Sequence, residues 1–162
     1  MAKNKKEDAD AKQTVATHRK ARHLYEILEV HEAGLALVGP EVKSLREGRA
    51  SLDGCFGRQE GGELFLFNFH IPPYKFNTSH EPLDPRRTRK LLLKHAEITR
   101  IGRSLQTKGF TLVPLEVYFR RGWAKVALAL ARGKKGPDRR DDLKQKAAYR
   151  EAEKSFKGKY RG

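Results

Sequence analysis

The sequence predicts a mainly β domain with short helices, in which about six strands close into a small barrel. Short apolar segments recur along the middle of the chain, turn residues join neighbouring segments as hairpins, and short helical patterns lie between the hairpins. The 162 residues are 38% hydrophobic, which is enough for one modest core but hardly for two. We therefore expect one folded domain with three short helices and two tails.

Six apolar segments are expected to pair as three hairpins. They join residues 25–30 to 35–38, 55–59 to 63–69, and 111–119 to 123–131. In the first hairpin Gly34 is expected in the turn, because glycine adopts positive φ at no steric cost. Both faces of segment 63–69 are largely apolar, which predicts a central strand.

Three short helices are expected between and after these hairpins. Pro40 before and Gly48 after the run Glu-Val-Lys-Ser-Leu-Arg-Glu predict a helix of about two turns. A basic helix is expected over residues 86–95, behind a capping Asp-Pro pair, and another over 97–106. Four prolines in residues 71–85 predict a long surface loop.

The domain organisation follows from where apolar residues stop. Residues 1–15 alternate Lys, Glu and Asp with Ala and are expected to be a disordered arm. Residues 16–133 hold the barrel. Residues 134–162 are expected to be a basic tail that is disordered when free, because they carry too few large apolar residues to pack a core. High helix propensity after Asp138 predicts that this tail folds as a helix on a polyanion.

The charge points to the class of partner. Lys and Arg number 35 against 20 Asp and Glu, a formal net charge of +15, which is typical of a polyanion binder. Nucleic acid is favoured over charges that serve only solubility, and it suits a barrel of the oligonucleotide-binding type. No segment has the roughly 20 apolar residues of a membrane span, and the first residues do not form a signal segment, so a cytoplasmic location is expected.

Catalytic and cofactor chemistry is not indicated. Cys55 is the only cysteine, so paired thiolates for zinc or a disulfide are excluded within the chain, and a buried or half-buried structural role is favoured. The six histidines lack the spacing of metal ligands on a helix, and no phosphate-binding Gly-rich loop or nucleophile elbow is present. We expect no cofactor, no metal and no enzymatic activity. A small ribonuclease with scattered His and Lys stays a remote alternative.

Several sequence words resemble those of the small protein B family. They are Arg19-Lys20-Ala21-Arg22-His23, Glu32-Ala33-Gly34, Glu41-Val42-Lys43-Ser44-Leu45-Arg46-Glu47-Gly48, Arg89-Lys90-Leu91-Leu92-Leu93 and Ala131-Arg132-Gly133-Lys134-Lys135. They occur in the family's order and cover residues 17 to about 142. The resemblance implies an oligonucleotide-binding-type barrel that binds the tRNA-like domain of tmRNA (SsrA RNA), and a tail that occupies the vacant decoding centre and mRNA channel of a stalled ribosome.

Two sets of site residues are expected. The resemblance implies that Glu32, Leu92 and Lys94 contact tmRNA, and the basic groups beside them are expected to bind its phosphates. The expected tmRNA-binding set is His18, Arg19, Arg22, His23, Glu32, Lys43, Arg46, Leu92, Lys94 and Lys125. The expected set for small-subunit ribosomal RNA is Phe56, Gly133, Lys134, Lys135, Asp138, Arg139 and Arg140. Alternatives are that Leu92 lies wholly in the core and that Phe56 is buried in the second hairpin.

Two departures and one alternative function accompany this interpretation. His18 stands where the family often has Asn, and Gly136-Pro137 stands where an aromatic residue or His usually precedes the Asp. Stacking on ribosomal RNA at position 137 is therefore not expected here.

The protein is expected to act as a monomer. The alternative in the same broad class is a general RNA-binding or ribosomal protein without preference for tmRNA.

Overall fold

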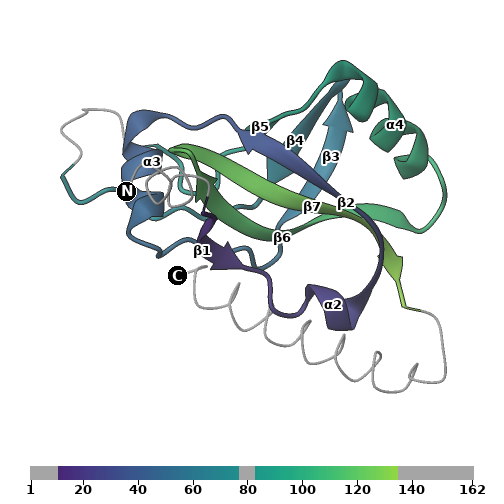
Figure 1. Cartoon of the computed structure of the whole chain (residues 1–162), viewed down its shortest axis with the longest axis horizontal. Coiled ribbons are helices and arrows are strands. Elements are labelled where there is room, and N and C mark those ends of the chain that lie inside the picture. The colour runs from purple at the N-terminus through teal and green to yellow at the C-terminus, as the bar shows by residue number, and fades with distance from the viewer. Residues whose placement is uncertain (1–10, 77–82, 135–162) are drawn as a thin grey trace, which may run out of the picture.

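A computed structural model describes residues 11–76 and 83–134, in which seven strands and three helices are assigned (Figure 1). Their bounds are β1 Gln13–Thr17, α2 Ala21–Leu24, β2 Tyr25–Leu35, α3 Gly39–Arg46, β3 Phe56–Glu60, β4 Glu63–Phe67, β5 Arg89–Leu92, α4 His95–Leu105, β6 Phe110–Arg120 and β7 Trp123–Gly133. β1 begins inside the range that the sequence analysis assigned to the N-terminal arm. Residues 1–10 of that arm and residues 135–162 lie outside the described residues.

Six of the strands form a closed barrel, as predicted. Their order is β6-β3-β4-β5-β2-β7, all pairs are antiparallel, and β7 pairs with both β2 and β6 to complete the ring. β6 is shared between three neighbours, because its first half pairs with β3 at Leu112 and its last residues pair with β1. A closed ring leaves few strand edges unpaired, so little backbone is open to pairing with another chain.

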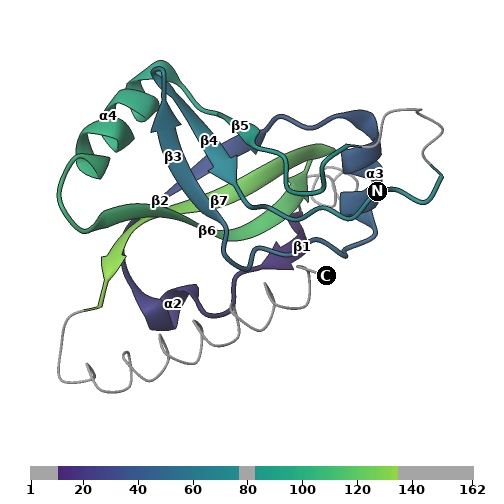
Figure 2. The ribbon, with the colours of Figure 1, turned by 180° about the vertical axis from the view of Figure 1, so that it is seen from behind.

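The barrel interior holds the main core, and the helices lie around the ring. Figures 1 and 2 show α3 and α4 at opposite ends of the barrel, with α2 against its outside. α2 buries Ala21 in a second, smaller apolar cluster with Val113, Leu115, Ala129 and Ala131. This cluster is possible because α2 covers small side chains on the outer face of β6 and β7. The sequence did not predict α2, which is only four residues long.

The first predicted hairpin is wrong. Residues 25–35 are one long strand, β2, which pairs along its length with β7 and at its end with β5. Gly34 is inside the strand and does not have positive φ. A Cβ added at Gly34 would lie 3.1 Å from the Cβ of Leu92 on β5, so the glycine permits close approach of two strands.

The helix predicted over residues 86–95 is also wrong, because residues 89–92 form strand β5. Burial alternates along it: Arg89 and Leu91 are buried, whereas Lys90 and Leu92 are exposed. The other predicted elements are confirmed. These are the helices α3 and α4, the hairpin of β3 and β4, and the hairpin of β6 and β7.

Arg89 on β5 is charged, and yet its side chain faces the interior of the domain. Its side chain is 0% exposed, and its Nε donates to Glu41 Oε2 at 2.7 Å. Other guanidinium nitrogens donate to the carbonyls of Phe69 and Pro85. Arg87 Nη2 donates to the second oxygen of Glu41 at 2.5 Å. This network holds α3 against β5. Arg87 and Arg89, which the sequence analysis placed in a basic helix, are therefore engaged with Glu41 and are not free to bind phosphates.

Glycine is required at a second close approach, between β3 and β6. A Cβ added at Gly57 would lie 2.5 Å from Cδ2 of Leu112, which is fully buried. We expect Gly57→Ala to destabilise the fold by about 1–3 kcal/mol, because overpacking a filled core forces neighbours to move. Chemical denaturation measures this. Gly39→Ala is the matched control, since its Cβ would meet nothing within 4 Å; a similar loss in both variants would contradict the packing argument.

Candidate nucleic-acid interface

Three of the expected tmRNA contacts come together on the outside of the barrel. Gly34 on β2 pairs with Leu92 on β5 and with Lys125 on β7, and Lys125 in turn pairs with Tyr118 on β6. Side chains of paired residues lie on the same side of a sheet. Glu32, two residues before Gly34, lies on this side as well. We call this surface the Glu32 face, made of Leu92, Gly34, Glu32, Lys125, Tyr118 and Arg120.

Glu32 is held in place by groups that the sequence analysis missed. The Tyr118 hydroxyl donates to its Oε2 at 2.5 Å, and Arg120 Nη1 donates to the same oxygen at 2.7 Å. The guanidinium of Arg120 lies 5.3 Å from the centre of the Tyr118 ring, and the Lys12 ammonium lies 4.8 Å from it. Glu32 and Arg120 keep 40% of their side chains exposed, so the carboxylate is oriented while it still reaches solvent.

The tyrosine in this network has an altered acidity. Burial raises the pKa of Tyr118 to about 12, helped by its hydrogen bond to Glu32 and the charge of that carboxylate. We expect Glu32→Gln to lower this pKa, because the negative charge is lost while burial remains. Ring-labelled tyrosine NMR across alkaline pH measures the change. Glu26→Gln on the same strand, whose partner is Arg132, should leave Tyr118 unchanged; an equal shift there would contradict the direct effect of Glu32.

The expected basic cluster at residues 18–23 divides between structural and exposed groups. His18 is half-buried, and its Nδ1 donates to the carbonyl of Pro114 at 3.1 Å. Arg19, Arg22 and His23 are exposed on and beside α2. The backbone of α2, anchored by Ala21, thus presents these three side chains on the outside of the barrel.

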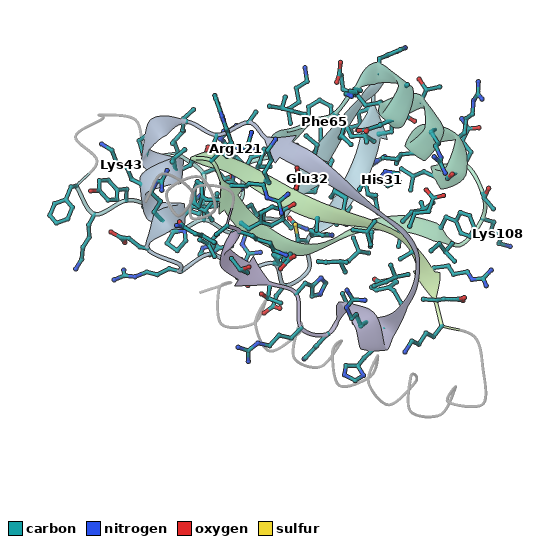
Figure 3. The ribbon with its side chains drawn as sticks, viewed as in Figure 1. His31, Glu32, Lys43, Phe65, Lys108 and Arg121 are labelled. Carbon is teal, nitrogen blue, oxygen red and sulfur yellow. The ribbon has the colours of Figure 1, made fainter. Side chains whose placement is uncertain are left out.

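The remaining expected tmRNA contacts lie at the two ends of the barrel. Lys43 and Arg46 are exposed on α3, where Lys43 lies 5.6 Å from the Tyr74 ring centre and Arg46 lies 4.3 Å from that of Phe119. Lys94 is exposed at the start of α4. Figure 3 shows Lys43 at the α3 end and Glu32 near the middle of the barrel. The predicted set therefore does not form one compact patch.

Leu92 and Phe56 are both exposed, which excludes their buried alternatives. Leu92 is 50% exposed on the Glu32 face. Phe56 is 37% exposed, and its ring is stacked on Phe67 across the β3–β4 hairpin, with centroids 5.3 Å apart and planes 6° apart. Such an aromatic pair offers a flat apolar surface on which a base can stack.

The expected ribosome contacts at the end of the barrel are described only in part. Gly133 ends β7 and is exposed, and Lys134 is exposed with its N–H donating to the carbonyl of Leu24. Lys135, Asp138, Arg139 and Arg140 lie outside the described residues.

Two observations bear on metal binding and on the reactivity of the single cysteine. Among residues 11–76 and 83–134, no three His, Cys, Asp or Glu side chains gather as a metal site requires. Cys55 is buried, and burial raises the pKa of its thiol, which disfavours the reactive thiolate. Within the same residues no helix has the length and apolar character to cross a membrane.

Comparison with known proteins identifies the family. The family model described as SmpB protein matches residues 15–158. The SsrA-binding protein of Elusimicrobium minutum is 50% identical over 144 residues, which is 89% of this chain and 91% of that protein. The SsrA-binding protein of Thermobifida fusca is 48% identical over 160 residues, with 97% and 98% covered.

A solved structure has the same fold. It is a chain of "tmRNA-SmpB: a journey to the center of the bacterial ribosome", with a TM-score of 0.64 and 54% sequence identity. The match covers 80% of this chain and 91% of that chain. On the evidence of its barrel and of these matches along most of its length, the chain belongs to the SmpB protein family.

Proposed function

We propose that this protein binds the tRNA-like domain of tmRNA and delivers it to stalled ribosomes in trans-translation. Membership of the SmpB family carries the proposal, and relatives of about 50% identity are SsrA-binding proteins. The Glu32 face supports it, because Glu32 and Leu92, which the resemblance implies as contacts, lie on strands next to Lys125, an expected phosphate partner. The protein acts by binding and not by catalysis, in the cytoplasm, as a monomer.

The proposed interface extends from the Glu32 face toward both ends of the barrel. Arg19, Arg22 and His23 beside α2 and Lys43 and Arg46 on α3 are exposed, and each arginine or lysine can neutralise a phosphate. His18 contributes by holding the backbone before α2 against β6, through its bond to Pro114. Lys94 extends the interface beyond Leu92.

A second interface is proposed for the ribosome. It comprises the stacked Phe56, the end of β7 at Gly133 and Lys134, and the tail residues Lys135, Asp138, Arg139 and Arg140. The exposed Phe56–Phe67 pair supports base stacking on small-subunit ribosomal RNA. The tail, with Phe56 and the end of β7, thus serves ribosomal RNA, whereas the Glu32 face and the exposed groups of α2 and α3 serve tmRNA.

The test compares the tRNA-like domain of tmRNA with an ordinary tRNA of equal length, titrated across salt. Non-specific phosphate attraction weakens equally for both RNAs, because it arises from counterion release. We expect a preference for the tmRNA domain that persists at high salt. Equal and steeply salt-dependent binding would reduce the function to general RNA binding, which the net charge of +15 alone would produce.

A further inference from the structure

Trp123 is the most exposed large apolar side chain among the described residues, at 73% exposure. It begins β7, directly after the two-residue turn Arg121-Gly122, where it pairs with Arg120. At this exposure the Trp123 side chain contributes little of the hydrophobic stabilisation that buried side chains on the same strand contribute. Its ring is therefore available to a partner outside the barrel.

Strand alternation places Trp123 on the outside of the barrel with Lys125. The intervening Ala124 packs against the core, and Val126 is fully buried in it. Positions 123 and 125 therefore have their side chains on the opposite side from these two residues. Lys125 pairs with Gly34 and with Tyr118. Trp123 thus lies two residues along β7 from Lys125, on the same side of the sheet as the Glu32 face.

The residues around Trp123 are held in place by their contacts. Arg120, its paired neighbour, is bound to Glu32 and lies against Tyr118. Arg121 and Gly122 have φ of 53° and 79°, as in the tight turns whose twist matches a β-hairpin. A ring on a paired strand beside such a turn loses little further freedom on binding, which favours affinity.

The acidic groups nearby are already paired. Glu32 accepts from Tyr118 and Arg120, and Glu116 forms an ion pair with Lys12. Within the described residues Lys125 has no ion-pair partner that would neutralise it. The local charge that remains available to a ligand is therefore positive, which suits an anionic polymer better than a protein surface of mixed charge.

We propose that Trp123 is a stacking platform for an unpaired base of the RNA that occupies the Glu32 face, with Lys125 at a neighbouring phosphate. A base stacked on an aromatic ring and a cation on the adjoining backbone are the usual elements of single-strand recognition. This inference rests on the proposed function and adds to it a residue that the expected tmRNA-binding set does not contain.

The first test uses the fluorescence of Trp123, because it is the only tryptophan of the chain. The full-length protein is titrated with the tRNA-like domain of tmRNA while binding is followed independently by filter retention. We expect tryptophan quenching to saturate at the same RNA concentration as retention. Retention without quenching would overturn the stacking platform and leave the proposed function standing. Absence of retention would overturn both.

Variants separate stacking from simple apolar contact. We expect Trp123→Leu to weaken binding about five- to 150-fold, the range for loss of one stacked base, and Trp123→Phe to retain most of the affinity. Phe76→Leu is the matched control, because Phe76 is 72% exposed and is not part of the Glu32 face. Equal binding by the leucine and wild-type proteins would overturn the proposal, as would weakening by leucine and phenylalanine alike.

Discussion

Glu41→Gln should destabilise the barrel by about 3–5 kcal/mol, the cost of leaving a buried charge without its partner. Arg89 is fully buried and Glu41 is 4% exposed, with Glu41 Oε2 2.6 Å from Arg89 Nη2. The guanidinium cannot lose its proton to escape burial. Total stabilities of small domains are about 5–15 kcal/mol, so a large fraction is at stake. Equilibrium urea denaturation measures the loss.

Two further variants show whether the loss comes from the buried charge. Glu41→Leu combined with Arg89→Met removes both charges, and we expect it to recover much of the stability, because paired apolar substitutes avoid the uncompensated ion. Glu26→Gln breaks the exposed pair with Arg132 and should leave the denaturation midpoint nearly unchanged. Equal destabilisation by the single and the double variant would show that shape, and not charge, holds α3 on β5.

The same pair predicts how stability depends on acid. Burial alone would raise the pKa of Glu41, but hydrogen bonds from Arg87, the Val38 backbone and Arg89 lower it below its usual value. A carboxyl with a depressed folded pKa stabilises the fold above its unfolded pKa and loses that contribution as pH falls through the folded value. Wild-type stability should therefore decline in acid more steeply than that of Glu41→Gln.

The strands whose turns carry local signals were predictable. Gly61 and Gly62 both have positive φ between β3 and β4, and Arg121 and Gly122 do so between β6 and β7. The failures arose where a glycine or a charged residue is required by a contact with an element far away in the sequence. Gly34 is a contact for Leu92, and Arg89 is a partner for Glu41. Neither relation is visible in a local window, because each joins residues far apart in sequence.

The candidate site, like the fold, was predictable only in part. The resemblance indicated Glu32 and Leu92, the positive charge indicated Lys125, and strand pairing brings the three together. Tyr118 and Arg120 were missed, because their approach to Glu32 depends on how β2 and β6 both pair with β7. An alternation count along β6, starting from its inward Val117 and Phe119, would have placed both residues outward. Lys12 was assigned to the arm, so its contact with Tyr118 had no signal at all.

Ending the chain after Gly133 should abolish peptide tagging on stalled ribosomes and leave specific tmRNA binding nearly intact. The Glu32 face and the exposed groups of α2 and α3 all precede this point. Residues 134–162 carry eleven Lys and Arg against five Asp and Glu, so their removal lowers non-specific attraction as well. Binding is therefore compared at high salt, where charge contributes least, and tagging is followed by the fate of a stalled peptide.

Paired substitutions in the full-length chain separate position from charge. Arg139→Ala with Arg140→Ala alters the word that the resemblance assigns to the decoding centre, whereas Lys144→Ala with Lys146→Ala removes the same charge farther along. We expect the first pair of substitutions to lose most tagging and the second to retain more of it. A contact with the decoding centre requires particular residues at particular positions, whereas general electrostatic attraction depends only on the total charge of the tail. Equal tagging by both variants would show that the tail acts only through its charge. In the truncation experiment, loss of tmRNA binding in parallel with loss of tagging would contradict the separate roles of the barrel and the tail.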